Sequence, residues 1–246
     1  MVLYGLIGYP LNHSLSAVLF SEKFRANKLY DRNYRLFPLT SPEQIKELVN
    51  GHPGIAGLNV TAPFKEKIIP FLDKINPLAA KIGAVNTIRV SRTASGTLLT
   101  GYNTDSEGFS SSTDFAGIKT ALILGTGGAA KAVAQALRSM EIKVLFVSRN
   151  SGLPDSITYA RIDAAFLKEF TLIVNATPLG MYPEVNSFPP IPYKHLAPDH
   201  FLYDLVYNPD QTRFLKKGIE KGCRMQNGLQ MLKNQADLSL RIWEGF

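Results

Sequence analysis

The chain is poor in cysteine, in long apolar runs and in clustered charge. Cys223 is its single cysteine, so an intramolecular disulfide is excluded, and no cysteine or histidine lies near it at metal-site spacing. No stretch approaches 18 uninterrupted apolar residues, and polar residues and Pro10 interrupt the apolar N-terminus, so we expect neither a membrane span nor a signal peptide. These absences favour a cytoplasmic protein in which the Cys223 thiol is packed in a core.

Charge is unbalanced but dispersed. The formal net charge is +7, yet lysines and arginines stand singly or in pairs such as Lys216-Lys217, without interleaved aromatic residues. This pattern argues against nucleic acid as a partner and favours a small anionic substrate and a phosphate-rich cofactor. The histidines show no ligand spacing, so we expect no metal site and treat them as surface or hydrogen-bonded loop residues. They are His13, His52, His195 and His200.

The first half of the chain alternates short apolar runs with amphipathic segments, which predicts an α/β unit with its own sheet. Strands are expected at 3–8, 32–38 and 55–60, with helices at 15–29, 42–49, 64–72 and 78–82. The segments 84–90 and 97–102 flank a turn rich in serine, threonine and glycine, which predicts a hairpin.

The second half starts again with the continuous apolar run 119–124, typical of a parallel strand buried on both faces. A helix through Met140 follows, and further strands are expected at 143–147, 172–176, 201–205 and near Arg224, with a helix at 212–221. This order predicts a Rossmann-like domain.

The last segment, Leu229 to Trp243, has apolar residues at helical spacing and could pack on either domain. We place the domain boundary between Tyr102 and Gly117, where the hairpin has ended and the next strand has not begun. The predicted fold class is α/β, with an N-terminal α/β substrate domain (1–104, joined by 229–246), a C-terminal Rossmann-like NADP-binding domain (105–228) and a cleft between them.

A glycine motif follows the first strand of the second half. Gly125-Thr126-Gly127-Gly128-Ala129-Ala130 comes directly after an apolar strand and opens a helix, which is the context of a dinucleotide-binding loop. Gly125 would make the tight turn, Gly127 would let the backbone approach a pyrophosphate, and Ala130 would let helix and strand pack closely. The free N–H groups of the helix N-terminus would bind the phosphates.

The end of the next strand bears on the choice of cofactor. An NAD enzyme places an acid there for the ribose 2′-hydroxyl, whereas this chain has Ser148-Arg149-Asn150. Nothing in this tripeptide repels a 2′-phosphate, and Arg149 offers a guanidinium, although a solvated charge at a strand end is the alternative. The sequence therefore favours NADP(H).

Polar clusters stand at predicted strand ends of the first half. Ser14 and Ser16 precede a helix, where the alternative role for either is a helix cap. Asn59 and Thr61 share one side of a strand at period two. Lys65 sits where a helix start would disfavour a cation, so we expect a carboxylate partner, with Asp105 as the candidate for a proton-transfer pair.

These motifs together resemble the shikimate dehydrogenase family, and the resemblance spans almost the whole chain. In the first half it rests on 7–10 (IGYP) with the two serines, 57–65 (GLNVTAPFK), 83–87 (GAVNT) and 101–105 (GYNTD). In the second half it rests on the glycine loop, 175–181 (NATPLGM), 203–209 (YDLVYNP) and 228–232 (GLQML) with Gln235 and Ala236.

The resemblance implies the reversible, NADPH-dependent reduction of 3-dehydroshikimate to shikimate, a step toward chorismate and the aromatic amino acids. It implies that Lys65 and Asp105 are catalytic and that the terminal helix folds back on the N-terminal domain. Its substrate residues would be Ser14, Ser16, Asn59, Thr61, Lys65, Asn86, Asp105, Tyr207 and Gln235. Its cofactor residues would be Gly125, Thr126, Gly127, Gly128, Ala129, Ser148, Arg149, Asn150, Thr177, Met181, Val206 and Gly228.

The sequence departs from the family pattern at several places. Ala17 and Ser106 replace a common proline and glycine, and Ser148-Arg149-Asn150 replaces the commoner Asn-Arg-Thr. Residues 151–158 are short and lack the helix that the family places after the second nucleotide-domain strand, which bears on the adenine pocket. Two alternatives are an NAD-dependent quinate/shikimate dehydrogenase and a non-catalytic sensor on the same scaffold. We expect a monomer or a homodimer.

Overall fold

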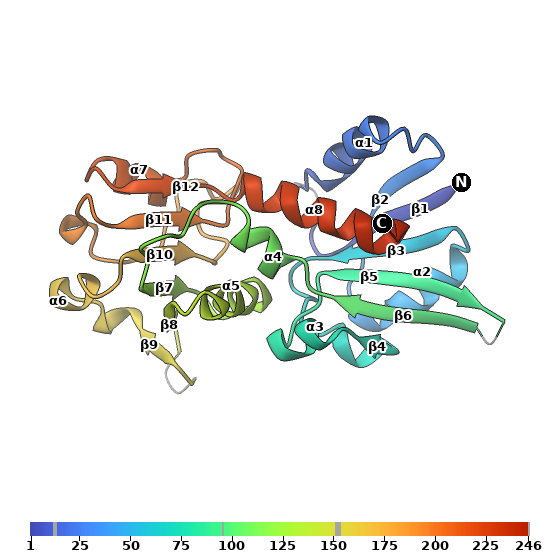
Figure 1. Ribbon diagram of the computed structural model, residues 1–246, viewed down its shortest axis with the longest axis horizontal. Coiled ribbons are helices and arrows are strands. Elements are labelled where there is room, and N and C mark those ends of the chain that lie inside the picture. Colours follow the sequence, from blue (N-terminus) through green and yellow to red (C-terminus); the bar gives the residue numbers. More distant parts are fainter. Residues whose placement is uncertain (12–13, 95, 151–153, 246) are drawn as a thin grey trace. The chain divides into compact units, whose positions relative to one another are not determined.

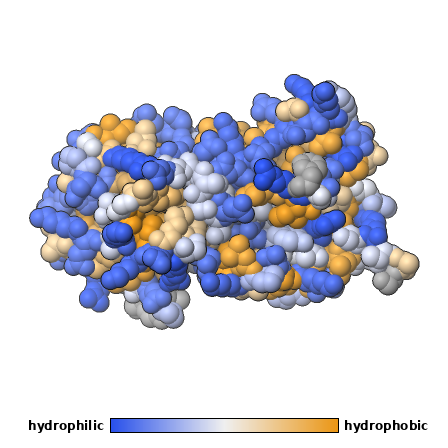
Figure 2. Space-filling model, in the orientation of Figure 1, coloured by the Kyte–Doolittle hydropathy of each residue, from blue (hydrophilic) through white to orange (hydrophobic). Residues whose placement is uncertain are grey.

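The computed structural model describes residues 1–11, 14–94, 96–150 and 154–245. The chain divides into two compact units, Met1–Thr104 with Gln235–Phe246, and Asp105–Asn234. The second division falls inside the terminal helix, at Gln235 rather than at the Leu229 expected. On the face drawn in Figure 2, hydrophilic residues predominate and hydrophobic ones form smaller groups between them. Within the described ranges, no helix is long and apolar enough to cross a membrane.

The first unit is built on a mixed six-stranded sheet of order β2-β1-β3-β5-β6-β4 (Figure 1). β1 is parallel to β2 and β3, whereas β5 is antiparallel to β3 and β6, which makes the hairpin expected. Its elements are β1 (Val2–Gly8), α1 (Ser16–Ala26), β2 (Arg32–Pro38), η1 (Pro42–Gln44), α2 (Ile45–Gly51), β3 (Ile55–Val60), η2 (Ile69–Phe71), β4 (Lys74–Ile75), α3 (Pro77–Ile82), β5 (Thr87–Thr93), β6 (Gly96–Tyr102) and the end of α8 (Leu229–Glu244).

Two apolar clusters cover the two faces of this sheet. Residues of α2 and α3 pack with one face, and residues of α1 and α8 pack with the other. In α8, Trp243 stacks on Tyr4 at 4.6 Å between ring centroids and donates its indole N–H to the Ile88 carbonyl at 3.0 Å. The Arg32 guanidinium binds both oxygens of Glu244 at 2.8 Å. The end of the terminal helix is therefore an integral part of the first unit.

The helix expected at 64–72 is wrong. The segment consists of turns and the short 3₁₀ helix η2, and only the Ile68 N–H to Phe64 carbonyl bond of 2.9 Å has α-helical spacing. Pro70 explains the failure, because it has no N–H to donate and its ring would clash with the carbonyl four residues earlier in an α-helix. The two-residue edge strand β4, which follows, had no signal in the sequence pattern.

The second unit is built on a six-stranded sheet of order β12-β11-β10-β7-β8-β9 in which every pair is parallel (Figure 1). The chain runs outward from β7 to β9 and returns to β10 beside β7, which is the doubly wound order expected. Its elements are α4 (Asp105–Ser110), β7 (Thr120–Leu124), α5 (Gly128–Ser139), β8 (Lys143–Ser148), β9 (Ser156–Thr158), η3 (Tyr159–Arg161), α6 (Ala164–Leu167), β10 (Leu172–Asn175), η4 (Tyr193–His195), β11 (Phe201–Asp204), α7 (Arg213–Ile219), β12 (Arg224–Gln226) and the start of α8.

Both faces of this sheet are buried, which is why its strands read as continuous apolar runs. In β7, Ala121 and Ile123 enter the cluster that α5 covers, and Leu122 and Leu124 enter the cluster that α6 and α7 cover. Cys223 is buried in the second cluster, as expected of a core thiol, and donates to the Ala197 carbonyl at 3.3 Å.

Several short elements of this unit were missed, namely α4, β9 and α6, because each spans only three to six residues. The stretch 151–158 was expected to lack a helix. Residues 151–153 lie outside the described residues, and among the others of this stretch Ser156–Thr158 form β9, which pairs with β8.

Candidate active site

A network of uncharged polar groups is buried where strands of the first unit end. Asn59 in β3 is 5% exposed, and its Oδ1 accepts from the Tyr34 hydroxyl at 2.8 Å. Its Nδ2 donates to the Asn86 carbonyl at 3.3 Å, to Thr87 Oγ1 at 3.2 Å and to Ser239 Oγ at 2.9 Å. Both ends of the Asn59 amide therefore have partners inside the fold, and this residue ties β2, β5 and α8 together.

Asn86 extends the same network. Its Oδ1 accepts from the Thr104 N–H at 2.7 Å, and its Nδ2 donates to Thr104 Oγ1 at 2.9 Å and to Gln235 Oε1 at 3.4 Å. Ser239, which accepts from Asn59, donates its hydroxyl to the Gln235 carbonyl at 2.9 Å and so links the two amides. Three of the predicted substrate residues, Asn59, Asn86 and Gln235, are thus brought together within one unit.

Sequence reasoning missed Ser239, which is fully buried. The available signal was a hydroxyl between Ala236 and Trp243 on the apolar stripe of the terminal helix, where a polar side chain requires a partner. Its contacts make it a positioning group for the amides around it.

The two serines at the start of α1 are not its N-cap. Leu15 occupies the cap position without a side-chain hydrogen bond, and Ser14 Oγ accepts instead from the Ser16 N–H at 3.2 Å. Ser16, which is 9% exposed, hydrogen-bonds to the Tyr34 hydroxyl. Burial raises the pKa of Tyr34 well above its ordinary value, and the Ser16 bond opposes this effect. Tyr34 therefore stays protonated, and its hydroxyl donates to Asn59 and so links Ser16 to the amide network.

Lys65 and Thr61 follow the end of β3. Lys65 is half-buried in a turn, and its carbonyl accepts from the Val85 N–H at 2.7 Å. The helix-dipole argument for its carboxylate partner therefore no longer applies. Thr61 is half-buried, and Asp105, the first residue of α4 in the second unit, is 4% exposed. The pairing of Lys65 with Asp105 stays a prediction.

The glycine loop follows β7 at the point where the strand order of the second sheet reverses. Gly125 has a φ of +110°, which an L-residue rarely adopts, and a Cβ there would lie 3.1 Å from the Ala176 carbonyl oxygen. Gly127 has an ordinary φ of −77°, and a Cβ there would meet nothing within 4 Å. The fold therefore needs a glycine at 125 but not at 127, and an open backbone at 127 fits the close approach of a phosphate.

The rest of the loop supports the same interpretation. Gly127 is the N-cap of the 12-residue helix α5, whose first turn contains no acidic residue, so its free N–H groups offer an anion site. Thr126, Gly128 and Ala129 are half-buried around it, and Ala130 is fully buried against the sheet, as the motif requires.

Ser148 is the last residue of β8, and Arg149 and Asn150 follow it. Ser148 is 7% exposed and its Oγ accepts from the Asn150 N–H at 3.1 Å, while Arg149 and Asn150 are exposed. Burial raises the pKa of Tyr159, the first residue of η3, and the positive charge of the Arg149 guanidinium opposes this rise. The absence of an acid in this tripeptide and the presence of Arg149 fit a 2′-phosphate.

A buried acid and amide join the loops after β10 and β11. Asn175 and Asp204 are paired in register and are both fully buried, with Asn175 Nδ2 donating to Asp204 Oδ1 at 2.9 Å. Asn175 Oδ1 accepts from the hydroxyl and the N–H of Thr177 at 2.6 and 3.1 Å. Asp204 Oδ1 accepts from the Val206 N–H at 3.0 Å, and Oδ2 from the Thr212 hydroxyl at 2.6 Å.

Sequence reasoning gave Asn175 and Asp204 no role. The signal was present, because each is a polar residue that ends an apolar strand, but their pairing depends on the register between two strands.

The other predicted cofactor and substrate residues of this unit lie after β10, β11 and β12. Gly228 is buried, donates its N–H to the Val206 carbonyl at 3.2 Å, and would bring a Cβ into overlap with the Leu205 carbonyl oxygen. Tyr207 is half-buried and Met181 is 45% exposed. Met181 lines a surface hollow formed by the segment after β10, together with Pro178, Leu179, Tyr182, Pro183, Glu184 and Ser187.

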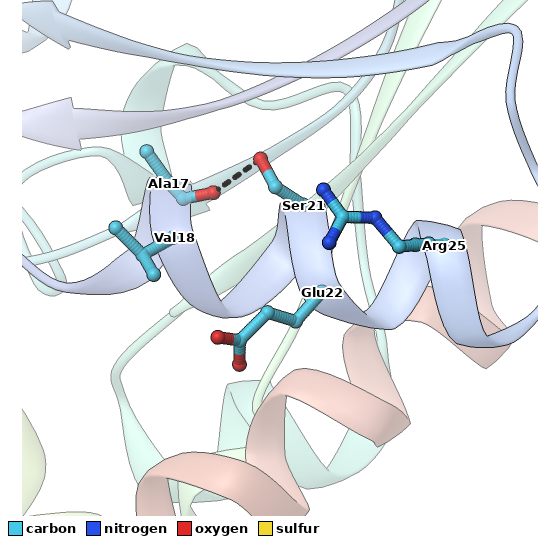
Figure 3. Close-up of a pocket in the computed structure, with 5 residues that line it drawn as sticks. All are labelled: Ala17, Val18, Ser21, Glu22 and Arg25. Atoms are coloured by element: carbon cyan, nitrogen blue, oxygen red, sulfur yellow. Dashed lines mark hydrogen bonds between the residues drawn. The ribbon is translucent and has the colours of Figure 1, made fainter.

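A second hollow lies on α1 and contains none of the predicted site residues. Figure 3 shows its side chains, with the Ser21 hydroxyl donating to the Ala17 carbonyl at 2.8 Å. Its lining is Ala17, Val18, Ser21, Glu22 and Arg25. Since only the exposed side of one helix forms it, we assign it no part in the reaction.

A parallel sheet with a glycine loop at its reversal point, in one chain with an α/β unit that buries a network of amides and hydroxyls, is the construction of a dinucleotide-dependent oxidoreductase. The family profile described as the shikimate dehydrogenase substrate binding domain matches residues 6–88. A shikimate dehydrogenase 38% identical over 99% of this chain shows that the chain belongs to the shikimate dehydrogenase family, which confirms the resemblance in the sequence.

The similarity extends over the full chain. The shikimate dehydrogenase (NADP(+)) of Carboxydothermus hydrogenoformans is 38% identical over 99% of this chain and 91% of its own length. The shikimate 5-dehydrogenase of Thermus thermophilus, solved in complex with NADP(H) and shikimate, is 33% identical with a TM-score of 0.84, covering 100% of this chain and 94% of its own. The quinate dehydrogenase of Corynebacterium glutamicum, in complex with NAD, is 28% identical with a TM-score of 0.82, covering 100% and 94%.

Proposed function

We propose that this protein catalyses the reversible, NADPH-dependent reduction of the ketone of 3-dehydroshikimate to shikimate. The observation that carries the proposal is the full-length similarity to shikimate dehydrogenases named for NADP(+), in a chain where Arg149 and Asn150 follow Ser148, the last residue of β8, without an acid. The same residues argue against a preference for NAD, since no carboxylate accepts from the ribose 2′-hydroxyl.

The residues divide between substrate and cofactor. Ser14, Ser16 and Tyr207 would bind the substrate carboxylate, and Thr61, Asn86, Asp105 and Gln235 would bind the ring hydroxyls. Asn59 would bind the ring hydroxyls with them, and its bonds to Tyr34 and Ser239 would fix the direction of its amide.

The cofactor would be bound by the glycine loop and residues 148–150, with Thr177, Met181, Val206 and Gly228 on the nicotinamide side. When bound, NADPH supplies the hydride. Lys65 would donate a proton to the oxygen of the ketone as negative charge develops there, and Asp105 would orient the ring and Lys65.

The proposal includes a cellular location and an oligomeric state. We propose that it works in the cytoplasm, as a monomer or a homodimer. Sedimentation of the purified protein would distinguish the two states.

Initial rates test the proposal. We would measure absorbance at 340 nm with shikimate or quinate and with NADP or NAD, for the wild type, Lys65→Ala and Lys67→Ala. We expect the shikimate and NADP combination to be fastest and to fall about 100- to 10,000-fold in Lys65→Ala, the range for loss of a general acid-base group. Lys67, exposed in the same turn, is the matched control and should keep its rate.

The other outcomes have defined meanings. Faster turnover of quinate or NAD would contradict the specificity, and a Lys65→Ala rate equal to that of Lys67→Ala would remove Lys65 from catalysis. A wild type that binds NADPH but turns over none of the four combinations would instead be a sensor.

A further inference from the structure

The Asn175–Asp204 pair lies beneath two loops that belong to different strands. Asn175 Oδ1 accepts two hydrogen bonds from Thr177, and Asp204 Oδ1 accepts one from the Val206 N–H. The bond of 2.9 Å between Asn175 Nδ2 and Asp204 Oδ1 is the side-chain link between the two sets. Thr177 and Val206 are therefore hydrogen-bonded to the two members of one side-chain pair.

The pair is fully buried, so water does not compete for its hydrogen bonds. Asn175 and Asp204 are each 0% exposed, and Asp204 Oδ2 is anchored on the other side by the Thr212 hydroxyl, which begins α7 as its N-cap. Asn175 Nδ2 also donates to the Leu179 carbonyl at 3.1 Å. A displacement of either side chain would break hydrogen bonds inside a dry core, which makes the arrangement stiff.

The glycine loop is packed against the segment after β10 that Asn175 orients. A Cβ on Gly125 would lie 3.1 Å from the Ala176 carbonyl oxygen and 3.2 Å from the Thr177 Cγ2. The segment after β10 therefore runs directly beside the phosphate loop.

From this geometry we propose that Asp204 and Asn175 are positioning residues for hydride transfer, which set the distance between the loops that carry Thr177 and Val206 and so place the nicotinamide ring. This inference rests on the proposed function. It assigns the pair no contact with substrate or cofactor, and it predicts an effect on the reacting end of the cofactor without one on the adenosine end.

The test separates the two ends of the cofactor. The probes are NADPH and adenosine 2′,5′-bisphosphate, which keeps the adenosine and the 2′-phosphate but has no nicotinamide. The variants are Asp204→Ala and Asn175→Ala, which each break the shared bond. Tyr203→Phe is the matched control, because it lies next to Asp204 in β11, is fully buried and loses one hydrogen bond of 2.8 Å, to Ser112.

We expect kcat to fall roughly 100-fold in Asp204→Ala and Asn175→Ala, the loss that a misplacement of about 1 Å can cause. Affinity for the bisphosphate should stay within about twofold, while the tighter binding of NADPH over the bisphosphate should shrink. Asp204→Asn keeps an oxygen that can accept from Asn175 and Val206 and should recover most of kcat. Tyr203→Phe should lose stability but keep kcat within about threefold.

Two results would overturn the inference. One is an unchanged kcat in either breaking variant, and the other is a parallel loss of bisphosphate affinity and kcat, which is what a merely structural role produces. If Asp204→Ala does not fold, the kcat and the affinities of Asn175→Ala alone test the inference. If neither variant folds, the test is Asp204→Asn, and a kcat as low as that of Lys65→Ala contradicts the inference. Failure of the proposed function is a separate result, because the wild type would then be inactive. In that case the difference between the affinities for NADPH and for the bisphosphate still measures how the nicotinamide is bound.

Discussion

Two glycines of one loop allow the same methyl group to be added with opposite consequences. Gly125 has a φ of +110°, and a Cβ added there would lie within 3.3 Å of backbone atoms of Ala176, whereas Gly127 has a φ of −77° and open space around it. An alanine at 125 adopts a left-handed conformation that costs about 1 to 2 kcal/mol, with a further cost from the close contacts. We expect Gly125→Ala to lose about 2 kcal/mol and to melt about 4 to 8 °C lower.

Gly127→Ala should leave stability within about 0.5 kcal/mol of the wild type. Alanine is a poorer N-cap than glycine by about 0.5 to 1 kcal/mol, but it also restricts the unfolded chain, which stabilises the fold by about 0.4 to 1 kcal/mol, so the two effects nearly cancel. The methyl group would instead meet a phosphate and lengthen its hydrogen bonds to the N–H groups of α5. Since hydrogen bonds to charged groups contribute about 1.5 to 3 kcal/mol each, losing one weakens NADPH binding at least tenfold.

The assays are thermal unfolding without ligand and a fluorescence titration with NADPH. The reasoning would be refuted if Gly127→Ala kept its NADPH affinity, because position 127 would then not face a phosphate. It would also be refuted if the two variants lost equal stability.

Three further outcomes are expected. Gly228→Ala should lose at least about 2 kcal/mol in thermal unfolding, because its Cβ would overlap the Leu205 carbonyl. The Arg32 guanidinium holds the pKa of Glu244 below its ordinary value, so its contribution is full at neutral pH and is lost as pH falls below about 4; Glu244→Gln should flatten that acid limb in denaturant titrations. Burial raises the pKa of Asp204 to about 7, so the free energy of unfolding should fall as pH rises from about 4 to 7, and Asp204→Asn should remove this slope.

The parts of the fold predicted from the sequence are those in which local pattern and tertiary environment agree. The run Thr120–Leu124 followed by a glycine loop is apolar on both faces, and the structure buries it on both faces. The segment 64–72 shows the opposite case, since Phe64 and Ile68 are buried but Pro70 prevents the helix that their spacing suggests. Burial alone therefore does not determine the backbone.

The candidate site was predictable where a motif carries its own context, as in the glycine loop. The groups that orient it were not, because the Asn175–Asp204 bond depends on strand register and the Asn59–Ser239 bond joins residues far apart in the chain. Neither relationship leaves a periodic signal in the sequence.

The two units secure their predicted ligand-binding residues by the same physical means but with different sensitivity to pH. In the first unit the buried partners of Asn59 and Asn86 are amides, hydroxyls and backbone groups, which carry no charge. In the second unit a carboxylate, Asp204, takes the corresponding place. Among the described residues no buried side-chain nitrogen or oxygen lacks a hydrogen-bond partner, so both arrangements are fully satisfied and rigid. A change of protonation near neutral pH should therefore alter the loops after β10 and β11 and leave the amide network of the first unit unchanged.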